Sequence, residues 1–552
     1  MAPGWNLVLT LLITSFVGQS HGFWPFTVAA TTDAPDTIYA NAGAKRIAII
    51  GAGAAGSSTA YYLEQFANKS GIAINVTVFE RNSYVGGRTT TVNAYDNPLE
   101  PVELGGSIFV DVNAILKNAS RTFGLRPRES DNDTNEILGI WNGKTFVYTQ
   151  KDSGWKYWDI AKLLWKYGLA PIRTQRLSKS VVGKFLKLYE FPFFPFRSLS
   201  DRAFDLDLVS ATSQTGEQLL TANNIGAPFT TDIIQASTRV NYGQNLASIH
   251  GLEALVCMSI EGAVQIQGGN WQIFDSMLKA SNTSTLLNTT VSSISKANGK
   301  YNIKTSSTDS ITKEVLTNEE AFDTVVLAAP LQYSDLKLQH GLLKRTPDVI
   351  PYVTLHVTLF ATNKTFSPLF FNLTAGTEVP TTILTTLPAD EVPEAPPKGV
   401  GSPGFFSIST LRQVINPKTL EKEYLYKIFS PEKITSEFLS KLFATEVPED
   451  LSSIKADSGD AITWYYPKVW QSYPYELPRV TFEDPELARG FYYTSGIESF
   501  ISTMETSALM GMNVAQLIVN DYLQLLEEQA HVENPTQAVL GEKLKNEHME
   551  EL

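Results

Sequence analysis

Residues 45–66 read KRIAIIGAGAAGSSTAYYLEQF, and this stretch decides the fold. The run 46–50 is apolar and rich in β-branched residues, as is typical of a buried parallel strand. It breaks into the G-x-G-x-x-G spacing at residues 51–56, and residues 57–66 have a helical pattern. A second strand at residues 76–79 ends on Glu80. Strand, glycine turn, helix, strand and terminal acid, in this order, predict a dinucleotide site in an α/β fold.

Each part of this stretch has a physical task. Gly51 permits the tight turn, Gly53 lets the backbone approach a pyrophosphate, and Gly56 lets the helix lie close to the strand. The helix N-terminus offers unpaired N–H groups to the phosphates, and Glu80 can accept hydrogen bonds from ribose hydroxyls. The candidate cofactor-binding residues of this segment are Gly51, Ala52, Gly53, Ala54, Ala55, Gly56, Glu80 and Arg81.

Two further glycine signals favour FAD over NAD. Residues 85–89 (VGGRT) form a second glycine turn that includes an arginine, and residues 103–107 read ELGGS. They resemble the extended fingerprint of flavoproteins of the amine oxidase and glutathione reductase type. That resemblance implies a Rossmann-like FAD-binding domain, an arginine that reaches the cofactor's phosphates, and glycines beside the flavin. It adds Gly87, Arg88, Gly105, Gly106 and Val291 to the candidate cofactor-binding residues.

The whole chain sets limits on the class of protein. Its 552 residues suffice for two domains, and 43% hydrophobic with 18% charged residues is a globular composition. A net charge of −13 argues against nucleic acid as the main partner, because phosphate would be repelled. The six histidines show no ligand spacing, so we predict no metal site.

The N-terminus predicts entry into the secretory pathway. Residues 1–22 have a short apolar run and small residues before a cut at Phe23, although no Lys or Arg precedes the run. An uncleaved anchor is the alternative, but the run is too short to span a bilayer comfortably. We expect a secreted, lysosomal or vacuolar glycoprotein. The candidate glycosylation sites are Asn68, Asn75, Asn118, Asn132, Asn282, Asn288, Asn363 and Asn372.

Flavin-domain character returns twice along the chain, which predicts interleaved, discontinuous domains. The FAD-binding segments are expected at residues 45–110, 239–332 and 486–526, with an apolar strand at 323–331 that closes the nucleotide-binding sheet. Residues 111–238 and 333–485 are expected to build an α+β substrate domain. A loop rich in proline and glycine spans residues 388–404, and residues 527–552 are expected to form a flexible acidic tail.

The last FAD-binding segment carries a second strong signal. Residues 492–498 predict a strand and a turn, and Met504 opens a helix. The segment resembles the closing part of amine oxidases, in which a positive helix N-terminus points at the flavin ring. The resemblance makes Glu498, Met504 and Glu505 cofactor-binding candidates. Cys257 is the one cysteine and lies outside this segment, so we expect non-covalent FAD and assign Cys257 no function.

Taken together, the sequence is identified as a member of the prenylcysteine oxidase (prenylcysteine lyase) family. The more specific motifs are residues 239–244 (RVNYGQ) and the pair Gly496-Ile497-Glu498 and Met504-Glu505. The resemblance implies oxidation of farnesyl- or geranylgeranyl-cysteine from degraded prenylated proteins. The C–H beside sulfur is oxidised, water adds, and cysteine and a prenyl aldehyde separate while O₂ becomes H₂O₂. We assign no catalytic side chain, since positioning and a dry pocket suffice.

Such a substrate predicts a long apolar tunnel. Residues 155–196 are rich in aromatic residues and suit its wall or mouth, and basic residues outnumber acids over residues 151–197. Basic residues beside aromatics can settle on anionic lipid, so this region is a candidate for peripheral membrane contact. Solvated amphipathic helices are the alternative explanation.

Two other functions remain open from the sequence. An amine or polyamine oxidase on the same scaffold would need an aromatic cage in front of the flavin, for which Tyr465, Tyr466, Tyr492 and Tyr493 are candidates. A non-catalytic prenyl-binding flavoprotein would hold FAD without releasing H₂O₂.

Overall fold

The stretch that decides the fold lies at the centre of a six-stranded sheet. The strand order is β18-β19-β11-β1-β2-β7, and β1 pairs in parallel with β2 on one side and β11 on the other. Ile47 and Ile49 of β1 are fully buried, as expected for a strand covered on both faces. The strands are β1 (Lys45–Ile50), β2 (Ile74–Phe79), β7 (Ser284–Leu286), β11 (Thr324–Leu327), β18 (Glu486–Ala488) and β19 (Phe491–Tyr493).

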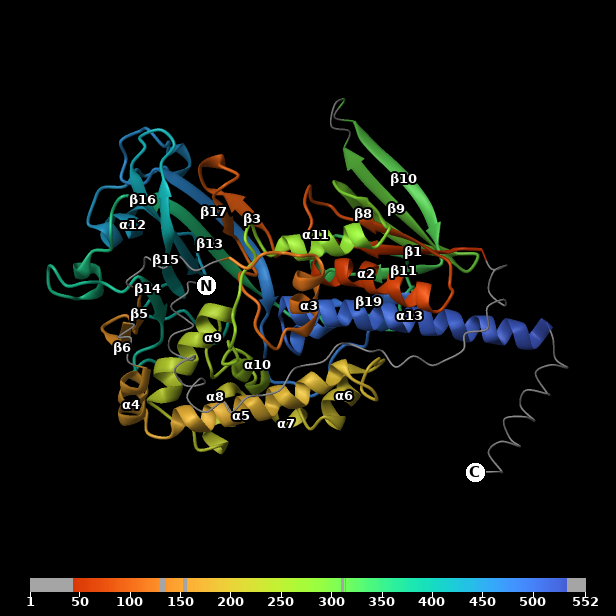
Figure 1. Cartoon of the computed structure of the whole chain (residues 1–552), viewed down its shortest axis with the longest axis horizontal. Coiled ribbons are helices and arrows are strands. Elements are labelled where there is room, and N and C mark those ends of the chain that lie inside the picture. The colour runs from red at the N-terminus through yellow and green to blue at the C-terminus, as the bar shows by residue number, and fades with distance from the viewer. Residues whose placement is uncertain (1–42, 129–135, 152–155, 309–311, 313, 534–552) are drawn as a thin grey trace.

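The computed structural model describes residues 43–128, 136–151, 156–308, 312 and 314–533. Figure 1 shows the six-stranded sheet with α2 (Ala54–Lys69) and α13 (Met504–Glu533) beside it, a larger sheet on the other side of the molecule, and a layer of helices below. The structure confirms the predicted α/β class with a Rossmann-like domain. The predicted signal peptide at residues 1–22 lies outside the described residues.

One expectation about the nucleotide-binding sheet needs correction. The strand predicted to close the nucleotide-binding sheet, β11, is an interior strand, because β19 from the C-terminal segment pairs with its free edge. Val291 lies in a second sheet of order β10-β9-β8-β12, in which β8, β9 and β10 pair antiparallel and β12 pairs in parallel with β8. Its strands are β8 (Thr289–Ala297), β9 (Lys300–Thr308), β10 (Val315–Phe322) and β12 (Lys337–Leu338).

A seven-stranded sheet forms the other side of the molecule, in the order β17-β13-β16-β15-β14-β5-β6. It joins two stretches far apart in the sequence, because β14 pairs in parallel with β5. Its strands are β5 (Ile137–Trp141), β6 (Phe146–Lys151), β13 (Tyr352–Thr362), β14 (Thr382–Thr385), β15 (Ser407–Ile415), β16 (Lys422–Ser430) and β17 (Trp464–Pro474), and a small hairpin of β3 (Thr91–Asn93) and β4 (Pro101–Glu103) lies nearby.

The helical layer lies below both sheets (Figure 1). Its helix α10 packs against α5, α7 and α8, and the buried apolar residues of this layer join those beneath the Rossmann-like sheet in one cluster. The helices apart from α2 and α13 are α3 (Ala114–Thr122), α4 (Lys156–Tyr167), α5 (Ala170–Phe185), α6 (Leu199–Asp205), α7 (Val209–Thr212), α8 (Gly216–Ala222), α9 (Gln235–Tyr242), α10 (Gly251–Val256), α11 (Trp271–Ala280) and α12 (Ser436–Phe443).

The loop at residues 388–404 is held by Arg239. The guanidinium of Arg239 is fully buried and donates to the carbonyl oxygens of Gly399 (3.0 Å) and Val400 (2.8 Å) and to Oγ1 of Thr385 (3.1 Å). Burial lowers the pKa of Arg239 to about 9. This charge is stabilised by neutral oxygens, so the arginine of the 239–244 motif fixes the loop against the seven-stranded sheet.

Helices α2 and α13 lie side by side (Figure 1), and their close approach depends on a glycine. A Cβ at Gly511 would lie 2.3 Å from the carbonyl oxygen of Ala55. Ser58 Oγ donates to the carbonyl of Ala508 across the same contact (2.7 Å). Residues 527–533, expected to belong to a flexible tail, continue this helix, because the leucines just before them still pack on the core.

The candidate glycosylation sites that the structure describes are all exposed; Asn132 lies outside the described residues. Passage through the secretory pathway stays a prediction. Within the described ranges, no helix is both long and apolar enough to cross a bilayer.

We predict that Gly511→Ala destabilises the protein, because the added methyl group would overlap the backbone of α2. Overpacking of this kind costs about 1–3 kcal/mol of unfolding free energy. Gly183→Ala in α5 is the matched control, since a Cβ there meets no atom within 4 Å and improves helix propensity. Thermal unfolding should show a lower midpoint for Gly511→Ala only. Equal midpoints for the two variants would contradict the close contact.

Candidate active site

A cavity of about 710 Å³ opens where β1, β2 and β11 end. Its volume is typical of a small-molecule site, and the carboxyl ends of parallel strands are where such folds bind ligands. Two candidate cofactor-binding residues, Ala52 and Gly56, lie behind the lining. The candidates that line the cavity are Gly51, Gly53, Ala54, Ala55, Glu80, Arg81, Gly87, Arg88, Gly105, Gly106, Val291, Glu498, Met504 and Glu505.

The two glycine turns meet at one edge of this cavity. Gly86 N donates to the carbonyl of Ala52 (2.9 Å), and a Cβ on Gly87, whose φ is +60°, would lie 3.3 Å from Gly53 Cα. A Cβ on Gly56 would lie 1.9 Å from the carbonyl oxygen of Gly51. Backbone therefore faces the cavity here with no side chain in front of it.

The N-terminus of α2 also faces this cradle. Its N-cap, Gly53, makes no side-chain cap hydrogen bond, and the first turn contains no acidic residue. N–H groups left open at a helix N-terminus attract anions such as a pyrophosphate. The cradle therefore fits a dinucleotide.

Glu80 is fixed in one orientation at the end of β2. Its Oε2 accepts a hydrogen bond from Ala52 N (2.9 Å), and its Oε1 accepts from Asn82 N (2.8 Å) and Asn82 Nδ2 (2.7 Å). Asn82 occupies both lone pairs of Oε1, whereas Oε2 has a further lone pair and can still accept from a ribose hydroxyl. Asn82 was not predicted from the sequence; its position two residues after the strand's terminal acid was the available signal.

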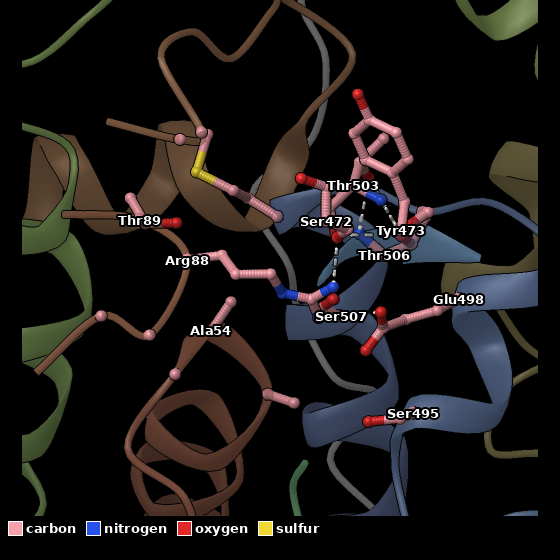
Figure 2. A pocket seen from close by; sticks show the side chains of 18 of the residues that line it. Ala54, Arg88, Thr89, Ser472, Tyr473, Ser495, Glu498, Thr503, Thr506 and Ser507 are labelled. Atoms are coloured by element: carbon pink, nitrogen blue, oxygen red, sulfur yellow. Dashed lines mark hydrogen bonds and ion pairs between the residues drawn. The ribbon is translucent and has the colours of Figure 1, made fainter. Parts of the chain in front are cut away.

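Arg88 forms an ion pair across the cavity. Figure 2 shows its side chain reaching from the second glycine turn to Glu498, with Nη2 2.8 Å from Oε2. Arg88 also donates to the carbonyl of Ser472, and the hydroxyl of Tyr352 donates to Glu498 (3.2 Å). Burial alone would lower the pKa of Arg88, but the charge of Glu498 reverses this and raises it. The arginine thus joins the first FAD-binding segment to the third and to β17.

Glu505 lines the cavity, but its carboxylate binds protein. Oε1 accepts from Ile115 N (2.9 Å) and the hydroxyl of Tyr189 (3.1 Å), and Oε2 accepts from Leu116 N (3.0 Å). An acidic group at the N-terminus of α3 stabilises that helix. Burial raises the pKa of Glu505 to about 7. The Glu505 carboxylate, in the first turn of α13, therefore fixes the N-terminus of α3 beside α13.

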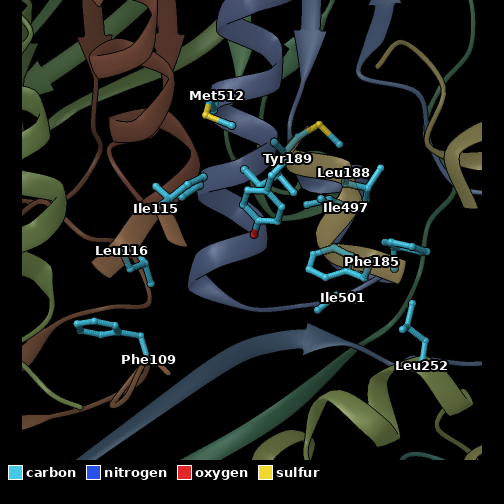
Figure 3. Packing of buried hydrophobic residues seen from close by; sticks show 14 of the residues in the cluster. Phe109, Ile115, Leu116, Phe185, Leu188, Tyr189, Leu252, Ile497, Ile501 and Met512 are labelled. Atoms are coloured by element: carbon cyan, nitrogen blue, oxygen red, sulfur yellow. The ribbon is translucent and has the colours of Figure 1, made fainter. Parts of the chain in front are cut away.

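Apolar side chains form a second wall of the cavity, which Figure 3 shows in part. Phe185 comes from the predicted tunnel region 155–196, whereas Trp165 and Phe191 of the same region are each 90% exposed. Cys257 also lines the cavity, and burial raises the pKa of its thiol well above the usual value. The wall residues include Phe109, Leu116, Val182, Phe185, Leu186, Val240, Val256, Ile260 and Ile501.

The tyrosines proposed for an amine oxidase cage do not line the described cavity: Tyr465, Tyr466, Tyr492 and Tyr493. A different pair, Tyr242 and Tyr473, does line it. Their rings pack edge to face with centroids 5.0 Å apart, so they contact each other instead of flanking a space between them.

The Rossmann-like cradle and the apolar wall define a two-domain, dinucleotide-dependent oxidoreductase. Solved structures with the same fold include a double mutant of putrescine oxidase (TM-score 0.52, 14% identity, 86% of this chain and 99% of that chain). Cyclohexylamine oxidase from Brevibacterium oxydans is similar (TM-score 0.51, 15% identity, 87% and 99%).

The chain belongs to the prenylcysteine lyase family, whose model matches residues 150–531, and a model for an NAD(P)-binding Rossmann-like domain matches residues 49–122. Similar proteins include farnesylcysteine lyase of Arabidopsis thaliana, 27% identical with 86% of this chain and 88% of that protein covered. Prenylcysteine oxidase 1 of Bos taurus is 27% identical, with 88% and 90% covered.

We predict strong coupling between Arg88 and Glu498. Arg88→Met leaves the carboxylate of Glu498 unpaired in a largely buried place and should cost at least about 2 kcal/mol of unfolding free energy. Glu498→Gln added to this variant should recover part of the loss, because no charge then remains without a partner. Denaturation of the two single variants and the double variant measures the coupling. Strictly additive losses would show that the pair is not formed.

Proposed function

We propose that this protein is an FAD-dependent thioether oxidase that acts on farnesyl- or geranylgeranyl-cysteine. The observation that carries the proposal is a dinucleotide cradle that opens into a cavity with an apolar wall. Membership of the prenylcysteine lyase family supports it, as do the names of the relatives, which describe cleavage or oxidation of prenylcysteine.

FAD fits the cradle and, we propose, is held without a covalent bond. The backbone at Gly51, Gly53 and Gly87 would contact the pyrophosphate, and Glu80 would hold a ribose. Cys257 keeps its proton because burial raises the pKa of its thiol, so it is a poor candidate for a cysteinyl link to the flavin. When bound, FAD supplies the two-electron oxidation of the carbon beside sulfur and returns the electrons to O₂.

The residues of the chain would position the substrate and exclude water. The prenyl tail is apolar and would lie along the wall that includes Phe109, Phe185 and Ile501. The overall reaction consumes the thioether, O₂ and one water, and yields cysteine, a prenyl aldehyde and H₂O₂. The oxidised carbon gains the water oxygen, and the C–S bond breaks with its electron pair on sulfur.

An amine or polyamine oxidase is the main alternative. The edge-to-face contact between Tyr242 and Tyr473 argues against it, because a cage needs two rings that face a space between them. A non-catalytic prenyl-binding flavoprotein would have the same cavity, so only a measurement of activity distinguishes it from the oxidase.

We predict that anaerobic addition of farnesylcysteine bleaches the flavin absorbance of the purified protein. Air should then restore the colour and release one H₂O₂ and one cysteine per turnover, because the two electrons pass from the thioether to O₂. Spermine is the control substrate. Bleaching by spermine alone would favour the amine oxidase, and no bleaching by either compound would favour the non-catalytic flavoprotein.

We also propose that the described part of region 151–197 contacts membranes from the periphery. Exposed apolar side chains occur at Trp165, Leu169 and Phe191 in this basic region. Lys166 is less available than the sequence suggested, because its Nζ lies 3.4 Å from Asp232 Oδ2. The aromatic side chains are therefore the better candidates for insertion between lipid headgroups.

The double variant Trp165→Ser/Phe191→Ser should bind vesicles that contain anionic lipid at least about ten-fold more weakly, since each lost apolar side chain removes about 1.5–3 kcal/mol of burial. Val315→Ser is the control, because Val315 is 67% exposed on β10 at the opposite side of the molecule (Figure 1). Vesicle co-sedimentation measures the binding. Equal binding by wild type and the double variant would exclude this surface.

A further inference from the structure

Three buried side chains gather behind the cavity wall, although the sequence showed no spacing that joins them. His250 precedes α10, Glu253 lies in its first turn, and Glu476 follows β17. All three are at most 1% exposed, and one polar atom from each lies within 4.8 Å of the others. Four of their atoms make no hydrogen bond: His250 Nε2, Glu253 Oε1 and both carboxylate oxygens of Glu476.

The imidazole of His250 argues against a metal ion at this cluster. Its Nδ1 accepts a hydrogen bond from Glu253 N (3.1 Å), so Nδ1 carries the lone pair. Burial lowers the pKa of His250 to about 3, so the ring is neutral and its proton must lie on Nε2. A protonated Nε2 cannot bind a metal. It lies 3.5 Å from Glu476 Oε2.

Two carboxylates this close in a dry place cannot both be ionised, because each loses its hydration and repels the other. Burial raises the pKa of Glu253 to about 8, and burial together with the charge of Glu253 raises the pKa of Glu476 well above its usual value. The pair therefore retains at least one proton at neutral pH.

The charged and titratable groups around the pair come from several elements. Arg479 is the cation that lowers the pKa of Glu476, and its Nη1 donates to Ser499 Oγ (2.8 Å). Glu498 adds a negative charge from the cavity side and raises the pKa of Glu476. Tyr242 from α9 and the thiol of Cys257 face Glu253. Arg88 is the ion-pair partner of Glu498, so among the described residues a single partly exposed arginine, Arg479, is left beside Glu253 and Glu476. This excess of carboxyl groups favours retention of a proton.

The pair reaches the cavity through Tyr242. Tyr242 lines the cavity, and its hydroxyl donates to the carbonyl of Ser502 (3.2 Å). Burial together with the nearby charge of Glu253 raises the pKa of this hydroxyl well above its usual value. Ser502 N donates to Glu253 Oε2 (3.3 Å), so Glu253 also holds the chain just before α13.

Two residues of the 239–244 motif, Tyr242 and Gln244, lie beside the two glutamates. Tyr242 contacts Glu253, and the Gln244 side chain accepts a hydrogen bond from Glu476 N (2.9 Å) and donates to the carbonyl of Pro474 (3.2 Å). The motif thus places the two glutamates beside each other and connects them to the cavity.

We propose that Glu253 and Glu476 share a proton and form an internal proton store that Tyr242 connects to the reaction cavity. Its role in turnover rests on the proposed function. Water that adds to the oxidised carbon loses one proton, and O₂ gains one proton beyond the hydrogen taken from the substrate when it becomes H₂O₂. The store accepts the first proton through the Tyr242 hydroxyl and returns it for the second step, so that protons balance over the cycle.

The shared proton can be tested without turnover. The infrared spectrum of the resting, FAD-loaded protein should contain the carbonyl band of a protonated, buried carboxyl group, and Glu253→Gln or Glu476→Gln should remove or shift it. Glu423→Gln is the matched control, because Glu423 is a buried glutamate outside the cavity lining that has partners in Tyr95, Thr463 and Asn416. A spectrum in which Glu253→Gln and Glu476→Gln change no such band would overturn the proposal.

The connection to the cavity needs a second measurement. Enzyme reduced by dithionite and mixed with O₂ requires no prenylcysteine, so this test is separate from the proposed function. The rate of flavin reoxidation in the wild type should fall at alkaline pH, where the pair loses its shared proton, because the pKa of both carboxyl groups is raised. Glu476→Gln and Tyr242→Phe should lower the rate at pH 7 at least about ten-fold, as expected for the loss of a proton donor.

Tyr242→Phe keeps both glutamates, so it should retain the infrared band while it slows reoxidation. FAD content and the thermal midpoint of each variant show whether it has folded. Folded variants with the wild-type rate and pH profile would show that the cluster is structural, and the proposal would then be wrong.

Discussion

The cavity depends on close contacts between backbone segments, which are possible because glycines place no side chain between them. The carbonyl oxygen of Gly51 occupies the place where a Cβ on Gly56 would lie, and the carbonyl of Arg88 does the same at Gly105. At Gly511, helix α13 also approaches the backbone of α2, where a Cβ would lie 2.3 Å from the carbonyl oxygen of Ala55. These contacts bring three distant segments to one edge of a cavity. A methyl group at any of them would push apart the surfaces that must face the dinucleotide.

Local signals in the sequence were sufficient to predict the secondary structure of the dinucleotide cradle. Residues 45–80 predicted strand, turn, helix and strand, and the structure has β1, α2 and β2 there. Such signals work because a glycine turn and a buried strand are determined by neighbouring residues. Resemblance to known flavoproteins added Arg88 and Glu498, which the structure joins in an ion pair.

Contacts between distant residues were not predictable in the same way. Glu505 stays a candidate cofactor contact, but its own residue type and position did not reveal that backbone N–H groups of α3 donate to both of its carboxylate oxygens. The strand at 323–331 was expected to close the nucleotide-binding sheet, because nothing in its own residues reveals that β19 will pair with it. His250, Glu253 and Glu476 became a cluster only through folding, since Glu476 is more than two hundred residues away in sequence. Pattern and spacing describe neighbours along the chain, whereas these outcomes depend on tertiary partners.

The interior position of β11 has a consequence for biosynthesis. On the ribosome, β1, α2 and β2 emerge more than four hundred residues before β19, which pairs with β11 in their sheet, and α13, which packs on α2. Contacts of such long range form slowly, and apolar surface is exposed until they do. The nascent chain must therefore keep an unfinished sheet from aggregating until β19 and α13 have emerged. For the same reason the molecule cannot be divided into halves that fold independently.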